Sequence, residues 1–180
     1  MRLETDRFFL QPLSETDITE KYLAWMKDET VIATLDPKRE QTQDSLKAYL
    51  YSHDGVKDFL LGIFTKEGEH IGNISFRSNP MHKIATAGIM IGEKAFWGKG
   101  VVLEARKALL DWAFDILGIE KIEAGCHNTN LPAVFNFKKQ KWVLEGIRKR
   151  HFIISDKPID VLLYAMFKKD WHEFRNSTGS

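Results

Sequence analysis

A strand, a loop with two glycines and an amphipathic helix are predicted one after another in the middle of the chain, and this succession limits the folds available to it. The stretch "FWGKGVVLEARKALLDWAF" runs from Phe96 to Phe114 and has glycines at positions 98 and 100. After the loop, apolar residues recur at helical spacing and charged residues fill the other side, which predicts a helix with one buried face. The apolar positions are Val102, Ala105, Leu109, Trp112 or Ala113, and Ile116, and the opposite positions are Glu104, Lys107, Asp111 and Asp115.

The glycine loop has the chemistry of an anion site. The first turn of a helix has backbone N–H groups without intrahelical partners and the positive end of the helix dipole, and glycine lets a ligand approach the main chain. These properties favour a phosphate group. The alternative is that the two glycines only provide a positive φ in a strand-to-helix turn. The sequence lacks the third glycine of a dinucleotide fingerprint and the Gly-Lys-Ser/Thr of a P-loop at this place.

The rest of the chain predicts strands at both ends and two helical crossovers between them. Hairpins are predicted for "FLLGIFT" with "HIGNISFR" and for "WVLEGIRKRHFII" with "IDVLLYAMF", and further strands for "RFFLQPL", "IATAGIMIG" and "KIEAGCH". Helices are predicted after "SETD", with Ser14 or Thr16 as cap, over "TQDSLKAYLYSH" with Thr42 as cap, and over "NLPAVFNFKKQ". This order predicts an α/β (α+β) protein with a single mixed, mostly antiparallel sheet and helices on both faces. We expect one domain over residues 1–172 and a disordered tail over residues 173–180.

Composition excludes several classes of function. At 180 residues and 43% hydrophobic content, the chain can bury a core of its own. Its 26 basic and 25 acidic residues leave a net charge of +1, which argues against nucleic acid or an anionic membrane as partner. The start "MRLETDRFF" lacks the apolar stretch of a signal peptide, and the longest apolar run, "VLLYAMF", is too short to span a bilayer. With a single cysteine, Cys126, the sequence predicts a cytoplasmic protein.

The string "IMIGEKAFWGKGVVLEARKALLDWAFDILGIEKIEAGCHNTNLPAVFNFKKQKWVLEG" resembles the GNAT N-acetyltransferase superfamily. Together with "LETDRFFLQPL" and "RKRHFIISDKPIDVLLYAMFKKDW", it is most similar to the branch of the ribosomal-protein N-terminal alanine and serine acetyltransferases, over nearly the whole chain. The resemblance implies a GNAT-like acyl-CoA N-acyltransferase fold with acetyl-CoA as co-substrate. It implies a pyrophosphate cradle made of Trp97, Gly98, Lys99, Gly100, Val101 and Val102, although the family usually has Gly or Ala in place of Val102.

The resemblance also implies contacts with the rest of the cofactor. The strand around Ile89, Met90 and Ile91 would hold the pantetheine arm by strand-like hydrogen bonds, where this strand and "KIEAGCH" splay apart. Asn130 matches the asparagine that contacts the arm, and Ala133 and Phe137 would pack along it. The residues leave a second interpretation of Asn130 open, because an asparagine there can simply cap the following helix.

The catalytic residues are less well defined. Relatives have a tyrosine in place of Phe137 or a serine in place of Ala133 near the sulfur, and some have a glutamate in place of Gly125; this chain has none of these groups. The remaining titratable candidates are Glu123, His127 and His151. Each of the three has a purely structural alternative. Cys126 and His127 are neighbours on a predicted strand and so point to opposite faces, which argues against a nucleophile–base pair. The histidines have no metal-ligand spacing, so no metal is predicted.

These observations predict an acetyl-CoA-dependent N-acetyltransferase in which a primary amine attacks the thioester directly in a ternary complex. The alternative is a GNAT-like module that binds CoA and regulates without turnover. A protein N-terminal α-amine, a small-molecule amine and an amino sugar are the candidate acceptors. Without a strong base, an amine of low pKa is favoured over a lysine side chain. The protein is expected to be a monomer or homodimer.

Overall fold

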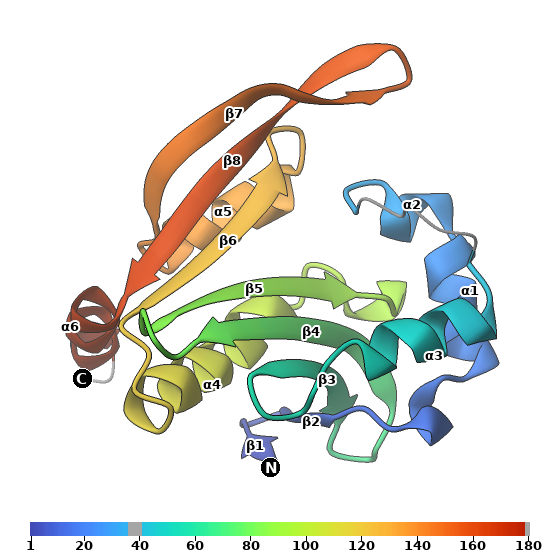
Figure 1. Cartoon of the computed structure of the whole chain (residues 1–180), viewed down its shortest axis with the longest axis horizontal. Helices are drawn as coiled ribbons and strands as arrows, with labels where there is room; N and C mark the ends of the chain where they lie inside the picture. Colours follow the sequence, from blue (N-terminus) through green and yellow to red (C-terminus); the bar gives the residue numbers. More distant parts are fainter. Residues whose placement is uncertain (36–40, 179–180) are drawn as a thin grey trace. The chain divides into compact units, whose positions relative to one another are not determined.

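The computed structural model describes residues 1–35 and 41–178, and its internal contacts divide the chain into two compact units. The first unit consists of Met1–Arg77 and Gly88–Leu109, and the second of Ser78–Ala87 and Leu110–Ser180. The strands β4 (His70–Asn79) and β5 (Ile84–Ile91) and the helix α4 (Val101–Asp115) contribute residues to both units. The sequence predicts one domain. Figure 1 labels the helices and strands that make up the two units.

The strands of the first unit form an antiparallel series. The first four are β1 (Leu3–Glu4), β2 (Phe8–Pro12), β3 (Asp58–Thr65) and β4. Their registers pair Leu3 with Leu10, Leu10 with Ile63, and Leu61 with Ile74. The predicted hairpin of β3 and β4 is therefore present, with a register shift at Ile63/Phe64.

Three short helices of the first unit begin at polar caps. They are α1 (Glu20–Lys27), α2 (Glu29–Ile32) and α3 (Gln43–Tyr51). The predicted cap Thr42 accepts a hydrogen bond from the N–H of Ser45 at the start of α3. At α1 the prediction of Ser14 or Thr16 as cap was wrong: Thr19 caps this helix, and Ser14 instead precedes the short 3-10 helix η1 (Glu15–Asp17). The carboxylate of Asp17 accepts from the Ser14 N–H at 2.8 Å, which closes the chain into this separate turn.

An apolar core joins these helices to the strands. It consists of Phe9, Leu13, Ile18, Tyr22, Leu23, Trp25, Val31, Leu46, Leu60 and Phe64, with Met26, Leu50 and Met90 packed against it. The burial of this cluster fixes the short helices, which are too short to be stable alone.

The second unit has a hairpin of long strands. Its elements are β6 (Lys121–His127), α5 (Leu131–Lys139), β7 (Val143–Ile154), β8 (Lys157–Phe167) and α6 (Lys168–Thr178). The residues Ile84–Thr86 of β5 pair in parallel with Lys121–Glu123 of β6, and β6 and β7 each pair with β8 in antiparallel orientation. The register of β7 shifts at Leu144/Gly146 and again at Arg148/Phe152.

The end of the described chain is helical where the sequence pattern predicts a disordered tail over residues 173–180. Helix α6 runs to Thr178, and only residues 179–180 of that stretch lie outside the described residues. Trp171 is 1% exposed, and its indole N–H donates to Asp111 Oδ1 at 2.8 Å. Arg175 pairs with Asp111 and Asp115 at 2.7 and 2.8 Å. These contacts with α4 residues more than 50 positions away order the helix.

Helix α4 ends one residue before the end of the predicted apolar stripe. Ile116, placed on the buried face by the periodicity, follows the last helical residue and is 74% exposed. The N–H groups of Ile116 and Leu117 both bond to the carbonyl oxygen of Trp112, and Gly118 has φ +69°. A left-handed glycine ends the helix here, as the sequence predicts.

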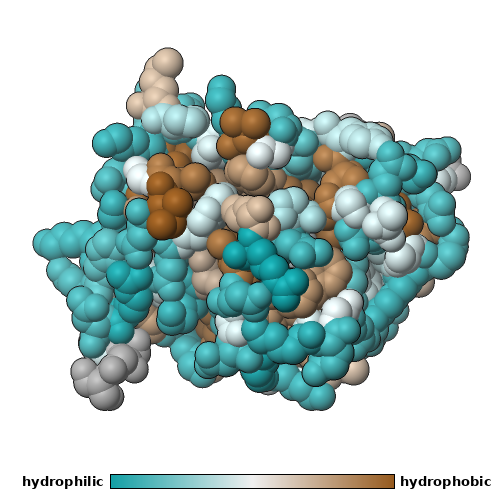
Figure 2. Space-filling model, turned by 90° about the horizontal axis from the view of Figure 1, so that it is seen from below, coloured by the Kyte–Doolittle hydropathy of each residue, from teal (hydrophilic) through white to brown (hydrophobic). Residues whose placement is uncertain are grey.

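The strand order β1-β2-β3-β4-β5-β6-β8-β7 makes an eight-stranded mixed sheet, and the predicted mostly antiparallel α/β fold class is confirmed. Figure 2 shows one face of the molecule, on which hydrophilic side chains surround several separate hydrophobic patches. In the described part of the chain, no helix has the length and apolar character needed to cross a membrane.

Candidate functional site

The glycine loop connects β5 to α4 through a short 3-10 helix, η2 (Lys94–Phe96). Gly98 has φ +72° and Gly100 has φ +77°, so both glycines adopt the left-handed conformation that other residues avoid. A Cβ atom on Gly98 would meet nothing within 4 Å, and one on Gly100 would meet only the Arg7 guanidinium at 3.6 Å. The glycines are therefore required for backbone geometry, and the space beside them is open.

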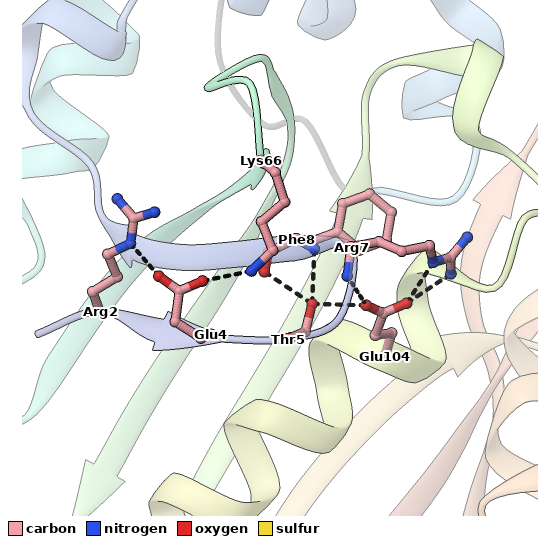
Figure 3. A network of polar contacts seen from close by, with 7 residues as sticks. All are labelled: Arg2, Glu4, Thr5, Arg7, Phe8, Lys66 and Glu104. Atoms are coloured by element: carbon pink, nitrogen blue, oxygen red, sulfur yellow. Dashed lines mark hydrogen bonds and ion pairs between the residues drawn. The ribbon is translucent and has the colours of Figure 1, made fainter.

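The loop is fixed from the side by Arg7 and Glu104 (Figure 3). The Glu104 carboxylate accepts hydrogen bonds from the Thr5 hydroxyl at 2.7 Å and from the Arg7 backbone N–H at 2.8 Å. It also forms an ion pair with the Arg7 guanidinium at 2.7 Å. The same guanidinium donates to the carbonyl oxygen of Lys99 at 3.0 Å. The start of the chain thus positions both the loop and the first turn of α4.

These contacts determine the charge of Glu104. Burial raises the pKa of its carboxyl group, but the hydrogen bonds from Arg7 and Thr5 and the nearby guanidinium lower the pKa by more. The net effect is a pKa below the ordinary range, so Glu104 is ionised at neutral pH. Its charge is matched by Arg7, and the amides of the first helical turn remain directed toward the loop.

A side-chain hydrogen bond connects the glycine loop to the end of β5. The indole N–H of Trp97 donates to the carbonyl oxygen of Ile91 at 2.8 Å, while the Trp97 side chain itself remains exposed. Two of the predicted cofactor residues, Ile91 and Trp97, are therefore in direct contact. The other two residues of the predicted pantetheine strand, Ile89 and Met90, line a cavity of the first unit.

This cavity has a volume of about 510 Å³. It is lined by residues of α1, α3 and the strands β3–β5, together with two residues of the segment before α3 and Ser52 directly after α3. The lining residues are Tyr22, Met26, Leu35, Gln41, Ser45, Leu46, Tyr49, Ser52, Leu60, Asn73, Ser75, Arg77, Gly88, Ile89 and Met90. A volume of this size and a mainly apolar lining with few polar groups are typical of a small-molecule site. The cavity was not predicted from the sequence, although polar Asn73, Ser75 and Arg77 alternating with apolar residues in β4 were a visible signal.

The predicted cofactor residues of the second unit lie on α5. Asn130 is the N-cap of this helix, and its side-chain oxygen accepts from the N–H of Ala133 at 3.1 Å. This is the structural role that the sequence left open, and it fixes the orientation of Asn130. Phe137 is 3% exposed and stacks on Tyr164 with ring centroids 4.4 Å apart. Its ring is thus part of the core of this unit.

The three catalytic candidates divide into two groups. The rings of His127 and His151 both contact Phe152, with centroid distances of 5.2 and 4.7 Å. His127 is 5% exposed, whereas His151 lies at the surface. Glu123 is not part of this cluster: its carboxylate pairs with Lys121 at 2.8 Å. The structure therefore brings the two histidines together and gives Glu123 a cationic partner.

His151 lies in an irregular part of β7. Arg148 is opposite Val161 and Phe152 is opposite Ile159, so residues 149–151 together oppose Asp160 alone. The Asp160 carboxylate accepts from the Arg150 backbone N–H and from the Lys149 ammonium group, both at 2.8 Å. The hydrogen bond from Lys149 and that from Arg150 lower the pKa of Asp160. His151 therefore lies where β7 departs from regular pairing with β8, on a strand that is exposed along most of its length.

No group of three or more histidine, cysteine, aspartate or glutamate residues in the described ranges 1–35 and 41–178 could hold a metal ion. In β6 the pairing with β8 is continuous from Lys121 to His127. Cys126 and His127 therefore lie on opposite faces of a regular strand, as its alternation predicts.

Comparison with known proteins identifies the family. A model described as "Acetyltransferase (GNAT) domain" matches residues 7–139. The chain therefore belongs to the GNAT family of N-acetyltransferases, and the predicted family is confirmed. Among curated relatives, Probable N-acetyltransferase YjcK of Bacillus subtilis (strain 168) is 30% identical over 63% of this chain and 64% of its own length. YnaD of the same organism, an N-acetyltransferase by name, is 24% identical over 96% of this chain and 100% of its own length.

Solved structures share the fold. The ribosomal-protein-S5-alanine acetyltransferase from Vibrio fischeri has a TM-score of 0.80 and 20% identity, over 95% of this chain and 98% of the other. Spermidine N-acetyltransferase from Vibrio cholerae, solved in complex with CoA and spermine, has a TM-score of 0.83 and 20% identity, over 92% of this chain and 98% of the other. The alignments cover 42% and 64% of the first two curated relatives. The GNAT-like fold class is thus confirmed.

Proposed function

We propose that the protein transfers an acetyl group from acetyl-CoA to a primary amine by direct attack in a ternary complex. The observation that carries this proposal is the rigid, open loop at Gly98 and Gly100, held by Arg7 at the start of α4 in a member of the GNAT family. Backbone amides at a helix N-terminus bind phosphate oxygens well. The residues Trp97–Val102 would form the pyrophosphate cradle, mainly through the main chain.

The remaining cofactor contacts are part of the same proposal. Residues Ile89–Ile91 would bind the pantetheine arm with main-chain groups, although the carbonyl oxygen of Ile91 already accepts from Trp97. Asn130 would contact the arm while its side-chain oxygen caps α5. Ala133 is half-buried and can contribute a small apolar surface, whereas Phe137 would act mainly by supporting the helix from the core.

The reaction needs a neutral amine. The two histidines are the better candidates for the base that takes a proton from this amine. The amine nitrogen attacks the thioester carbonyl carbon, the tetrahedral intermediate loses the CoA thiolate, and the nitrogen gives up a proton to a base or water. The rings of His127 and His151 both contact Phe152, and an imidazole is the most frequent general base in enzymes. Glu123 is a weaker candidate because its carboxylate is already engaged in an ion pair with Lys121 at 2.8 Å.

A base of histidine strength favours an amine of low pKa. A lysine-like amine has a pKa of about 10.4. An α-amine has a pKa of about 7.7–8.0 and is therefore neutral far more often at pH 7. We therefore expect an N-terminal α-amine or a small amino compound as acceptor. The alternative function is a CoA-binding module without turnover, which is favoured by the absence of a hydroxyl group at Ala133 and Phe137.

The test of the proposed function follows free thiol after acetyl-CoA is mixed with three acceptors at neutral pH. These are a peptide with a free N-terminus, an N-blocked peptide with one lysine, and an amino sugar, and mass spectrometry reads the acetylated products. Labelling of the α-amine or the amino sugar supports the proposal. Preferential labelling of lysine would contradict the low-pKa acceptor, and stabilisation by CoA without thiol release from any amine would favour the regulatory module.

A further inference from the structure

Three polar residues of the 510 Å³ cavity lie on β4. Asn73, Ser75 and Arg77 are alternate residues of this strand, so their side chains emerge on the same face. The other lining residues are apolar except for Gln41 and for residues with hydroxyl groups, which are Tyr22, Tyr49, Ser45 of α3 and Ser52 directly after α3. Burial raises the pKa of Tyr22, which keeps its hydroxyl group neutral.

Asn73 lines this cavity and has a buried hydrogen-bond donor. Its side chain is 5% exposed, and in the described part of the chain its Nδ2 atom has no hydrogen-bond partner. The orientation of the amide follows from His70, whose Nε2 atom lies 3.1 Å from the carbonyl oxygen of Gly72 and 2.8 Å from Asn73 Oδ1. A carbonyl oxygen only accepts, so Nε2 carries the hydrogen and Oδ1 is the atom that faces it.

The donor left over is therefore Nδ2. Burial lowers the pKa of His70, although the hydrogen bonds from Nε2 raise it, so the ring stays neutral and its role does not change at neutral pH. A buried donor without a partner lowers the stability of the protein, because it has lost its hydrogen bonds to water without replacing them. A ligand with a carbonyl or carboxylate oxygen at this place would remove that cost.

Arg77 supplies a positive charge at the other end of the polar face. Its side chain lines the cavity and forms no ion pair with any residue in ranges 1–35 and 41–178. Asp58 is opposite in the strand register, but the two are not within ion-pair distance. Four residues along a strand span about 13 Å, so Asn73 and Arg77 would meet separate parts of one ligand.

The charge of the cavity excludes one class of acceptor. None of the described lining residues is acidic, whereas a polyamine with several positive charges needs carboxylates to replace its water. An arginine instead favours a carboxylate, which it can bind through two parallel hydrogen bonds. The spermidine N-acetyltransferase solved with spermine therefore has the same fold, but the ligand expected for this chain carries a negative charge that spermine lacks.

From these contacts we infer that the acceptor is an amine of dipeptide size that also carries a carboxylate: Arg77 binds the carboxylate and Asn73 Nδ2 donates to a carbonyl oxygen of its body. This inference rests on the proposed function, because it places the amine near Ile89 and Met90, where the acetyl donor would be held. It names the substrate class, whereas the family leaves the acceptor open.

The test uses the dipeptide Ala-Phe and its C-terminal amide. The two compounds have the same amine and the same apolar side chain and differ in the distant negative charge. With saturating acetyl-CoA, we expect kcat/KM for the acid to exceed that for the amide by at least about tenfold, or about 1.4 kcal/mol. Arg77→Gln should bring this ratio close to one without changing KM for acetyl-CoA, and Arg77→Lys should retain part of it.

Lys169→Gln is the matched control, because Lys169 is 85% exposed on α6 and lies outside the cavity. An equal rate for acid and amide in the wild type, faster turnover of spermidine, or an unchanged ratio in Arg77→Gln would overturn the inference while leaving acetyl transfer established.

A binding experiment separates the two proposals. N-acetyl-Ala-Phe and its amide have no reactive amine, and ligand-detected NMR can measure their binding to the 180-residue protein without acetyl-CoA. Tighter binding of the acid that is lost in Arg77→Gln supports the inference even if no amine is ever acetylated, in which case only the proposed function fails. Equal or undetectable binding of both compounds contradicts the inference.

Discussion

Arg7 and Glu104 form an ion pair of 2.7 Å across 97 positions of sequence, and the same guanidinium holds the carbonyl oxygen of Lys99 at 3.0 Å. The pair therefore connects the N-terminal segment, the glycine loop and the first turn of α4. Through these contacts, Arg7 and Glu104 would stabilise the proposed pyrophosphate cradle without touching the ligand.

Replacing Glu104 by Gln should weaken both the fold and the cofactor site. The change removes the negative charge that pairs with the Arg7 guanidinium and accepts a hydrogen bond from Thr5. The free energy of unfolding should therefore fall by about 1–2 kcal/mol. KM for acetyl-CoA should rise because the loop loses its lateral support. Glu120→Gln is the control, since Glu120 is 56% exposed and lies 3.9 Å from Lys168. Similar effects of the two variants in urea unfolding and kinetics would show that Glu104 has no special role.

The contribution of Glu104 to the free energy of unfolding should disappear at acidic pH. Its pKa is lowered in the folded protein, so its stabilising effect is fully present above the ordinary glutamate pKa of 4.5 and is lost as the pH falls through the lower, folded-state value. The difference in unfolding free energy between the wild type and Glu104→Gln should therefore narrow between pH 6 and pH 3. Urea unfolding at several pH values measures this difference. A gap that stays constant or widens on acidification would contradict the assigned pKa shift.

The role of the glycine loop can be separated from backbone strain by a matched pair of variants. Gly100 and Gly118 have φ values of +77° and +69°, so alanine should cost each of them about 1–2 kcal/mol in stability. Only Gly100→Ala should also raise KM for acetyl-CoA, by about tenfold or about 1.4 kcal/mol. Lys99→Ala should change KM less, because an exposed charge adds little to the backbone amides. Equal KM values for the two glycine variants would leave both glycines with a structural role alone.

The proton path can be located by removing the histidines one at a time. His151→Ala should lower kcat by about 10²–10⁴ if its imidazole is the base, while acetyl-CoA binding stays intact. His127→Gln should alter the pH dependence of kcat/KM, with some loss of stability because this ring is buried. His82→Ala is the control, as His82 is another exposed histidine of the second unit. Unchanged pH profiles in both variants would move attention to Glu123, despite its ion pair with Lys121.

Helix α6 should contribute measurably to stability. Deleting residues 173–180 removes Arg175 and the Phe174 ring, which stacks on Trp171 at 5.6 Å. The loss should be at least about 2 kcal/mol from ion-pair and packing contacts. Deleting only residues 179–180 is the control. If calorimetry gave the same melting temperature for both truncations, the contacts between Arg175 and α4 would have no energetic importance.

Local patterns predicted the elements whose stabilising contacts are also local. The hairpin of β3 and β4, the Thr42 cap and the succession of β5, loop and α4 all appear where periodicity and turn residues place them. Helix α6 did not follow from local pattern, because the contact that orders it joins Trp171 to Asp111. The cap of α1 was misplaced because Ser14 and Asp17 close a separate turn before Thr19.

The candidate site shows the same limit. The two glycines and the helix start could be predicted from sequence, since their chemistry lies within a few residues. Their support by Arg7 could not, because nothing in the local pattern shows which distant cation will reach Glu104. The cavity is built from α1, α3 and β4, and its lining becomes apparent only when those elements are packed together.

The strand β7 has a consequence for the behaviour of the protein in concentrated solution. It is the last strand in the sheet order, and one edge of it has no neighbouring strand in the described part of the chain. The two register shifts and the left-handed Arg150, with φ +52°, interrupt the regular row of main-chain groups that a foreign strand would need. Three consecutive basic residues, Arg148 to Arg150, add repulsion between identical copies. The bulge that contains His151 thus disfavours edge-to-edge pairing of identical copies, and we expect a variant with a straightened β7 to gain a pairing edge at the expense of colloidal stability.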